Sequence, residues 1–89
     1  MTREEVFELI SSERNYQESL SSARTDGSSK TVGDYITMLS HYVNKMQEAW
    51  TMNPGNTAAL DVMRKVGAIA VHCMEDHGAP GRFNGTVAR

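Results

Sequence analysis

Cysteine, proline, positive charge and long apolar runs are all scarce in this chain of 89 residues. The single cysteine excludes an internal disulfide, so a small domain must find its stability elsewhere. No apolar run approaches the roughly 18 residues that a membrane-spanning helix needs. Nine lysines and arginines against eleven aspartates and glutamates give a net charge of −2, which argues against general binding to long nucleic acids. Any anion must therefore be bound by a few basic residues at one site.

The chain is expected to form a single domain. Its expected location is the cytoplasm. The residues from Met1 to Glu5 lead directly into an amphipathic pattern, and not into the continuous apolar core of a signal peptide. A length of 89 residues is near the lower limit for a self-sufficient core. Periodicity is lost after Pro80, so we expect a single domain over residues 1–82 and a flexible tail over residues 83–89.

A first helix is predicted from a capping box formed by Thr2 and Glu5, and its pattern continues to about Ala23. Its first half carries the apolar residues Val6, Phe7, Leu9 and Ile10. Its second half interrupts this stripe with the polar residues Glu13, Arg14 and Gln17. Two interpretations stay open. Either the helix is short and its second half lies on the surface, or the polar groups serve a ligand.

The second helix has the clearest pattern in the sequence. Turn-forming residues fill 24–30, after which Thr31 caps a helix with Asp34 at the third helical position. Apolar residues then recur at steps of three and four at Val32, Tyr35, Ile36, Leu39, Tyr42, Val43, Met46, Ala49 and Trp50. This spacing predicts a long amphipathic helix.

The stretch from Thr57 to Arg82 has the longest unbroken helical periodicity, and its apolar surface is wide enough to need more than one neighbour. Gly78 can adopt the left-handed conformation that ends a helix, and Pro80 cannot continue one. The tight turn at residues 53–56 forces the second and third helices to lie antiparallel.

Two helices of about 22 residues extend about 33 Å, and so long and thin a hairpin leaves apolar surface that one chain cannot bury. The expected fold is therefore all-α, with a short N-terminal helix and a long antiparallel helical hairpin. Self-association is the simplest way to cover the remaining surface, so we expect a compact homo-oligomer.

Metal-dependent chemistry is the alternative that the residues leave open. Glu5 and Glu8 lie one helical turn apart, as in an all-helical nucleotide pyrophosphatase, but that chemistry needs a second carboxylate pair, which the third helix does not supply. Cys73 and His77 share a helical face, yet a tetrahedral zinc site would need further ligands such as His41. We expect no metal, no cofactor and no catalytic set.

Three other features have residue types that bind nucleotides. Residues 27–31, Gly-Ser-Ser-Lys-Thr, place Lys30 and Thr31 where the free amide groups of a helix start bind anions. Tyr16 can stack on a base. Arg64 either pairs with a neighbouring carboxylate or grips phosphate at a subunit interface. Each feature is also typical of ordinary caps, packing and ion pairs.

Several short segments resemble those of one known family. They are Arg14-Asn15-Tyr16-Gln17 on the first helix, Ser29-Lys30-Thr31 before the second, and Ala59 to Val66 and Cys73 to Pro80 on the third. Together with the hairpin, they resemble small phage proteins, the anti-CBASS cyclic-oligonucleotide sponges of the second type, which share a helical hairpin with some anti-Thoeris sponges. The resemblance covers about residues 10–82.

The resemblance implies a homohexamer that sequesters cyclic di- and trinucleotides in the host bacterial cytoplasm without cleaving them, and so serves immune evasion. It implies that Tyr16 stacks on a base. It further implies that Lys30 and Thr31 contact the ligand and that Arg64 reaches a phosphate. A sponge needs affinity and stoichiometry, so the lack of a complete catalytic set agrees with a protein that is not an enzyme.

Overall fold

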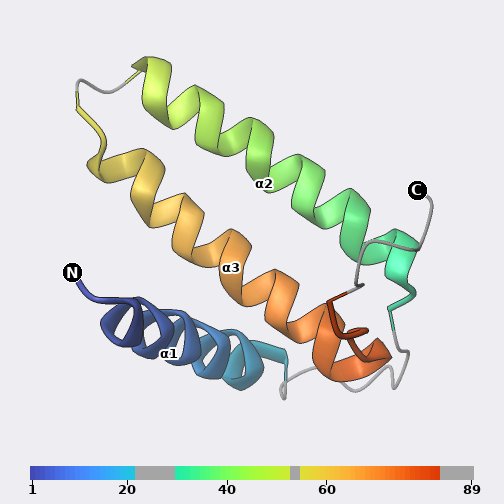
Figure 1. Cartoon of the computed structure of the whole chain (residues 1–89). Helices are drawn as coiled ribbons and strands as arrows, with labels where there is room; N and C mark the ends of the chain where they lie inside the picture. Colours follow the sequence, from blue (N-terminus) through green and yellow to red (C-terminus); the bar gives the residue numbers. More distant parts are fainter. Residues whose placement is uncertain (22–29, 53–54, 83–89) are drawn as a thin grey trace.

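The computed structural model describes residues 1–21, 30–52 and 55–82, and these residues form three helices and no strand (Figure 1). The helices are α1 (Arg3–Ser21), α2 (Val32–Met52) and α3 (Thr57–His77). The all-helical prediction is therefore confirmed. The expectation of a short first helix is wrong, because α1 has 19 residues against 21 in each of the others. No helix in the described ranges is long and apolar enough to cross a membrane.

The helix ends follow the local sequence signals. Thr2 and Glu5 exchange hydrogen bonds of 2.9 and 3.1 Å at the start of α1, and Thr31 and Asp34 do the same at the start of α2. The helix α3 ends before Gly78, as predicted, but a φ of 83° with a ψ of 170° is not the left-handed helical conformation that the sequence suggests. The predicted turn at 53–56 and the predicted tail at 83–89 lie partly or wholly outside the described residues.

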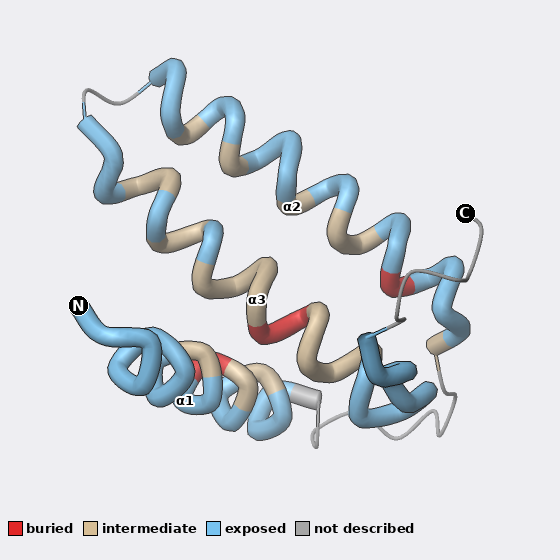
Figure 2. The backbone as a smooth tube through the Cα atoms, viewed as in Figure 1, coloured by how far each residue is buried: buried red, intermediate tan, exposed pale blue. Residues whose placement is uncertain are grey.

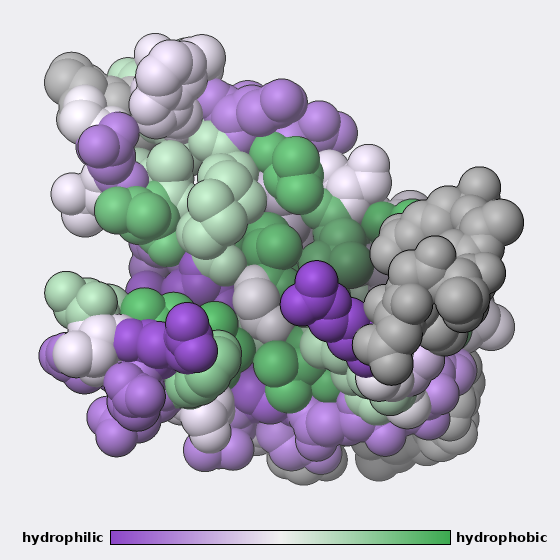
Figure 3. Space-filling model, in the orientation of Figure 1, coloured by the Kyte–Doolittle hydropathy of each residue, from purple (hydrophilic) through white to green (hydrophobic). Residues whose placement is uncertain are grey.

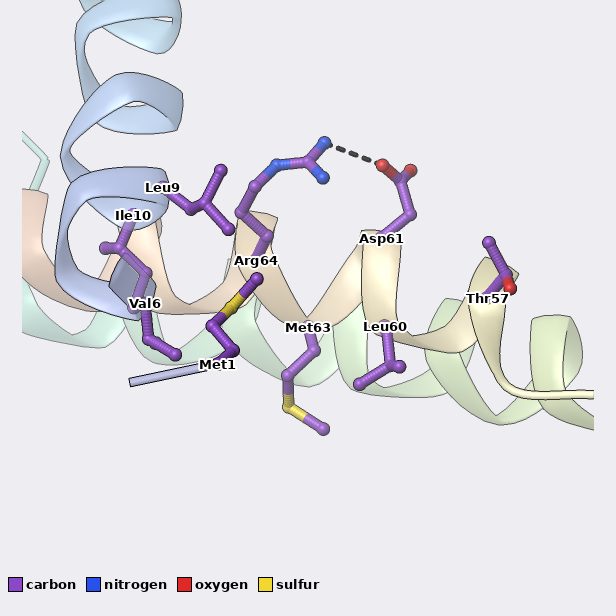
Figure 4. A pocket seen from close by; sticks show the side chains of 9 residues that line it. All are labelled: Met1, Val6, Leu9, Ile10, Thr57, Leu60, Asp61, Met63 and Arg64. Atoms are coloured by element: carbon purple, nitrogen blue, oxygen red, sulfur yellow. Dashed lines mark hydrogen bonds and ion pairs between the residues drawn. The ribbon is translucent and has the colours of Figure 1, made fainter. Parts of the chain in front are cut away.

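The helix α3 lies between the other two. Both α1 and α2 pack on α3, and within the described ranges they do not pack on each other. Figure 1 shows α2 beside α3 along its length, whereas α1 crosses α3 steeply, as Figure 4 also shows. The wide apolar surface predicted for α3 is therefore divided between two neighbours.

Few residues are coloured as buried in Figure 2. Tyr35 of α2 and Ala68 and Ile69 of α3 are the buried hydrophobic residues of the described part, with exposed fractions of 1%, 0% and 4%. Gly67 lies directly beneath Ile10 of α1, and a Cβ atom at this glycine would be 3.1 Å from Ile10 Cδ1. The missing side chain lets the two helix backbones approach closely where they cross.

Much apolar surface stays in contact with solvent. On α2, an exposed stripe with steps of four and seven consists of Val32, Ile36, Val43 and Trp50. Figure 3 shows a band of hydrophobic side chains over α3, between α1 and α2. The single chain therefore leaves a large apolar area uncovered.

Candidate functional site

A surface hollow of about 400 Å³ lies where α1 crosses α3, and we call it the crossing hollow. Four of its lining residues come from α1 at steps of three and four, which places them on one helical face. Arg64 of α3 closes the other side. The lining residues are Leu9, Ser12, Glu13, Tyr16 and Arg64. Two residues that sequence reasoning assigned to ligand binding, Tyr16 and Arg64, are thus brought together.

Tyr16 is 59% exposed, so its ring has an accessible surface at the edge of the hollow. Arg64 is held more tightly. Its Nε donates a hydrogen bond of 2.9 Å to Glu13 Oε1, and its Nη2 donates one of 2.6 Å to Asp61 Oδ1. These two hydrogen bonds raise the pKa of Arg64, and the bond from Arg64 in turn lowers the pKa of Asp61.

The charges around Arg64 cancel. Asp61 also forms an ion pair of 3.5 Å with Lys65, so the cluster contains two carboxylates and two cations. Of the two roles that the sequence leaves open for Arg64, the structure shows the pairing with neighbouring carboxylates, and its contact with a ligand stays a prediction. Glu13 is one of the polar residues for which the sequence leaves a ligand role open, but it is not assigned to the site of Tyr16, although it lies one turn before Tyr16 on the same helical face.

Three polar residues in the second half of α1, Glu13, Arg14 and Gln17, contact α3. Glu13 is 9% exposed, and the side chain of Arg14 is 11% exposed. Arg14 Nε donates a hydrogen bond of 2.6 Å to Glu75, and Gln17 Nε2 donates one of 3.4 Å to the backbone oxygen of Lys65. The interpretation that this half lies on the surface is therefore wrong for these residues, because they join the two helices.

An apolar groove of about 450 Å³ adjoins the crossing hollow, and Leu9 and Arg64 line both. We call it the N-terminal groove. Figure 4 shows the side chains that line it, which come from the start of the chain, from α1 and from the first half of α3. They are Met1, Val6, Leu9, Ile10, Thr57, Leu60, Asp61, Met63 and Arg64.

Lys30 and Thr31 lie at a different place, where α2 begins. Thr31 Oγ1 accepts a hydrogen bond from the backbone of Asp34, and the Asp34 carboxylate accepts one from the backbone of Thr31. The pKa of Asp34 is lowered by these bonds. The backbone oxygen of Lys30 accepts a hydrogen bond of 2.8 Å from His77 Nε2. The rest of the predicted anion loop, residues 27–29, lies outside the described residues.

The four predicted residues do not meet within one chain. Residues 64 and 77 of α3 are thirteen positions apart, which corresponds to about 20 Å along a helix. Because Lys30 contacts His77, it lies near the far end of α3 from Arg64. The structure therefore contains two separate pairs, Tyr16 with Arg64 and Lys30 with Thr31.

No model of a protein family, no curated protein and no solved structure matches this chain.

A cluster around Tyr35 was not anticipated from the sequence. Tyr35 Oη donates a hydrogen bond of 2.6 Å to Asp76, and the ring makes T-shaped contacts with His72 and His77 at centroid distances of 5.3 and 6.0 Å. Burial and the bond to Asp76 raise the pKa of Tyr35, while the same bond lowers the pKa of Asp76. This cluster fastens the start of α2 to the end of α3.

The residues considered for metal chemistry have other contacts. Glu5 Oε1 accepts the backbone hydrogen bond of the capping box, and this bond lowers its pKa. His77 contacts the Lys30 backbone, and Cys73 is half-buried. Within the described ranges, no group of three histidine, cysteine, aspartate or glutamate residues could hold a metal ion.

Proposed function

We propose that this protein is a non-catalytic binding protein that sequesters cyclic di- and trinucleotides of bacterial anti-phage signalling in the host cytoplasm. The observation that carries the proposal is the crossing hollow, where the exposed ring of Tyr16 lies beside Arg64. An aromatic face with a neighbouring guanidinium is the combination that binds unstacked bases, since stacking tolerates any base and the cation adds to it. The resemblance to anti-CBASS sponges supplies the ligand class.

Self-association completes the proposal. In it, α2 and α3 form a long antiparallel hairpin, and copies of the chain assemble as a compact homo-oligomer, with a hexamer as the expected size. The exposed stripe of α2 and the N-terminal groove support this, because both would leave water on association.

Assembly would also explain the two separate pairs of site residues. Lys30 and Thr31 of one copy and Tyr16 and Arg64 of another could contact one ligand only across an interface. A cyclic ligand repeats the same nucleotide around a symmetry axis, and repeated subunits present the same side chains to each repeat.

The test is titration calorimetry with cyclic GMP-AMP and with cyclic tri-AMP. Stacking of a base on an aromatic ring contributes about 1–3 kcal/mol, so Tyr16→Ala should weaken binding by about 5- to 150-fold. Phe7→Ala is the matched control, because Phe7 is also an aromatic residue of α1 and is 61% exposed. It lies outside the crossing hollow and should leave the affinity nearly unchanged.

A result in which neither cyclic nucleotide binds the unmodified protein would overturn the proposal for these ligands. Equal losses in Tyr16→Ala and Phe7→Ala would show that any exposed aromatic residue on α1 matters, and would remove the crossing hollow from the binding site.

A further inference from the structure

The carboxylate of Glu13 is the least expected group in the crossing hollow. Its side chain is 9% exposed, and its only hydrogen-bond partner among the described residues is Arg64 Nε, which contacts Oε1. The second oxygen, Oε2, has no partner in the described ranges. Oε2 also keeps some solvent-accessible surface, because the only buried side-chain nitrogen or oxygen without a hydrogen-bond partner in the described residues is Arg14 Nη1. A buried carboxylate with a free oxygen is therefore available to a hydrogen-bond donor in the hollow.

The electrostatics of the hollow suit a neutral ring better than a phosphate. Arg64 already contacts Glu13 and Asp61, and Lys65 also contacts Asp61, so the charges of the cluster cancel. A phosphate that approached Arg64 would meet the Glu13 carboxylate within the same hollow, and like charges at short range repel. A neutral base that carries donors meets no such repulsion.

We propose that the crossing hollow binds a nucleobase and not a phosphate, and that Glu13 selects guanine by accepting hydrogen bonds from its Watson–Crick edge. This inference rests on the proposed function and names the group of the ligand that enters this hollow. Arg64 is then a positioning residue, which holds the Glu13 carboxylate in place, and the phosphate contact implied by the resemblance falls elsewhere.

The arrangement of donors and acceptors favours guanine. The ionised carboxylate only accepts hydrogen bonds, and guanine offers two adjacent donors, at N1 and at its exocyclic amino group. Adenine places an acceptor nitrogen beside its amino group, so only one of its atoms can face a carboxylate favourably. Inosine keeps the N1 donor but lacks the amino group. Tyr16, one helical turn from Glu13, can cover the ring of the same base.

The experiment compares three cyclic dinucleotides that differ only in their bases, namely cyclic di-GMP, cyclic di-IMP and cyclic di-AMP. In the unmodified protein we expect affinity to fall in that order, with cyclic di-GMP about 5- to 150-fold tighter than cyclic di-AMP, the range for one good bidentate base contact. Calorimetry of the unmodified protein needs no variant, so the proposal can fail even if a substitution prevents folding.

Two variants separate a base from a phosphate. Glu13→Gln should reduce the preference for cyclic di-GMP over cyclic di-AMP to less than threefold. Asp61→Asn is the matched control, because it removes the other carboxylate from Arg64 but lies outside the crossing hollow, and it should keep the preference. If the hollow instead binds phosphate, both substitutions remove negative charge near Arg64 and both should tighten the binding of all three ligands.

The failures are distinguishable. Equal binding of the three ligands by the unmodified protein, or tighter binding of all three by both variants, would overturn the guanine assignment and leave sequestration standing. No binding of any of the three, together with none of cyclic GMP-AMP and cyclic tri-AMP, would overturn the proposed function and this inference with it.

Discussion

Adding a methyl group at Gly67 tests how α1 crosses α3. A Cβ atom at this position would lie 3.1 Å from Ile10 Cδ1, 3.3 Å from Cγ1 and 3.8 Å from Cγ2. Its three nearest neighbouring atoms therefore all belong to Ile10. Two of these distances are shorter than ordinary carbon contacts, whose optimum is about 3.5–4.0 Å. Gly67→Ala should therefore push α1 away from α3 or force Ile10 out of its position.

Two opposing effects set the magnitude. Alanine in a helix interior is about 1 kcal/mol more favourable than glycine, whereas overpacking a filled contact costs about 1–3 kcal/mol. We expect Gly67→Ala to destabilise the protein by about 1 kcal/mol. Ile10→Ala removes the three atoms nearest to the new methyl group, so Gly67→Ala should then stabilise by about 1 kcal/mol, a coupling of about 2 kcal/mol.

Urea unfolding followed by circular dichroism measures all four proteins of this cycle. The subunit concentration must be the same throughout, because self-association would add a concentration-dependent contribution to stability. Gly33→Ala is the matched control, since a Cβ atom there would meet only Thr31 Oγ1, at 3.7 Å. It should not destabilise in either background. If Gly67→Ala has the same effect with and without Ile10, the two helices do not cross at this point.

Three further predictions concern the second helix. Tyr35→Phe removes the hydrogen bond that lowers the pKa of Asp76. This bond contributes its full stability above the ordinary aspartate pKa of 3.8, and the contribution is lost as pH falls through the lower pKa of the folded protein. Urea unfolding at a series of pH values should therefore show that the variant loses less stability on acidification than the unmodified protein. Thr31→Ala removes the cap of α2 and should cost about 1 kcal/mol in the same assay, while Thr31→Ser should retain most of it. Ile36→Lys places a charge in the exposed stripe of α2 and should lower the mass measured by sedimentation; an unchanged mass would exclude this stripe from an interface.

The sequence predicted those parts of the fold that depend on neighbouring residues. The capping boxes at Thr2 and Thr31 and the stop at Gly78 each need only a few adjacent positions, and each is found as predicted. The helical character of all three segments follows from their periodicity in the same way.

Contacts between distant positions could not be predicted from such patterns. The partners Arg14 and Glu75 are 61 residues apart, and Glu13 and Arg64 are 51 apart. A polar interruption in the stripe of α1 shows that polar groups are present, but not which charge on another helix they meet. The burial of Glu13 therefore appeared only with the fold.

The second helix shows a related limit. Its apolar pattern predicts a single stripe, yet Tyr35 is 1% exposed and its neighbour Ile36 is 59% exposed. Periodicity defines an apolar surface wider than one neighbour can cover, and the position of α3 decides which part of it is buried. For the candidate site, periodicity placed Tyr16 on a helix, but only the crossing of α1 over α3 placed it beside Arg64.

The most direct test of non-catalytic sequestration is to recover the ligand. The purified protein is saturated with cyclic GMP-AMP, separated from unbound ligand and denatured, and the released nucleotide is analysed by chromatography. We expect intact cyclic GMP-AMP at a fixed ratio to subunits, unchanged when magnesium is added and the incubation is prolonged. Release of linear or cleaved nucleotide would show an enzyme, and would favour the metal-dependent pyrophosphatase that Glu5 and Glu8 suggest.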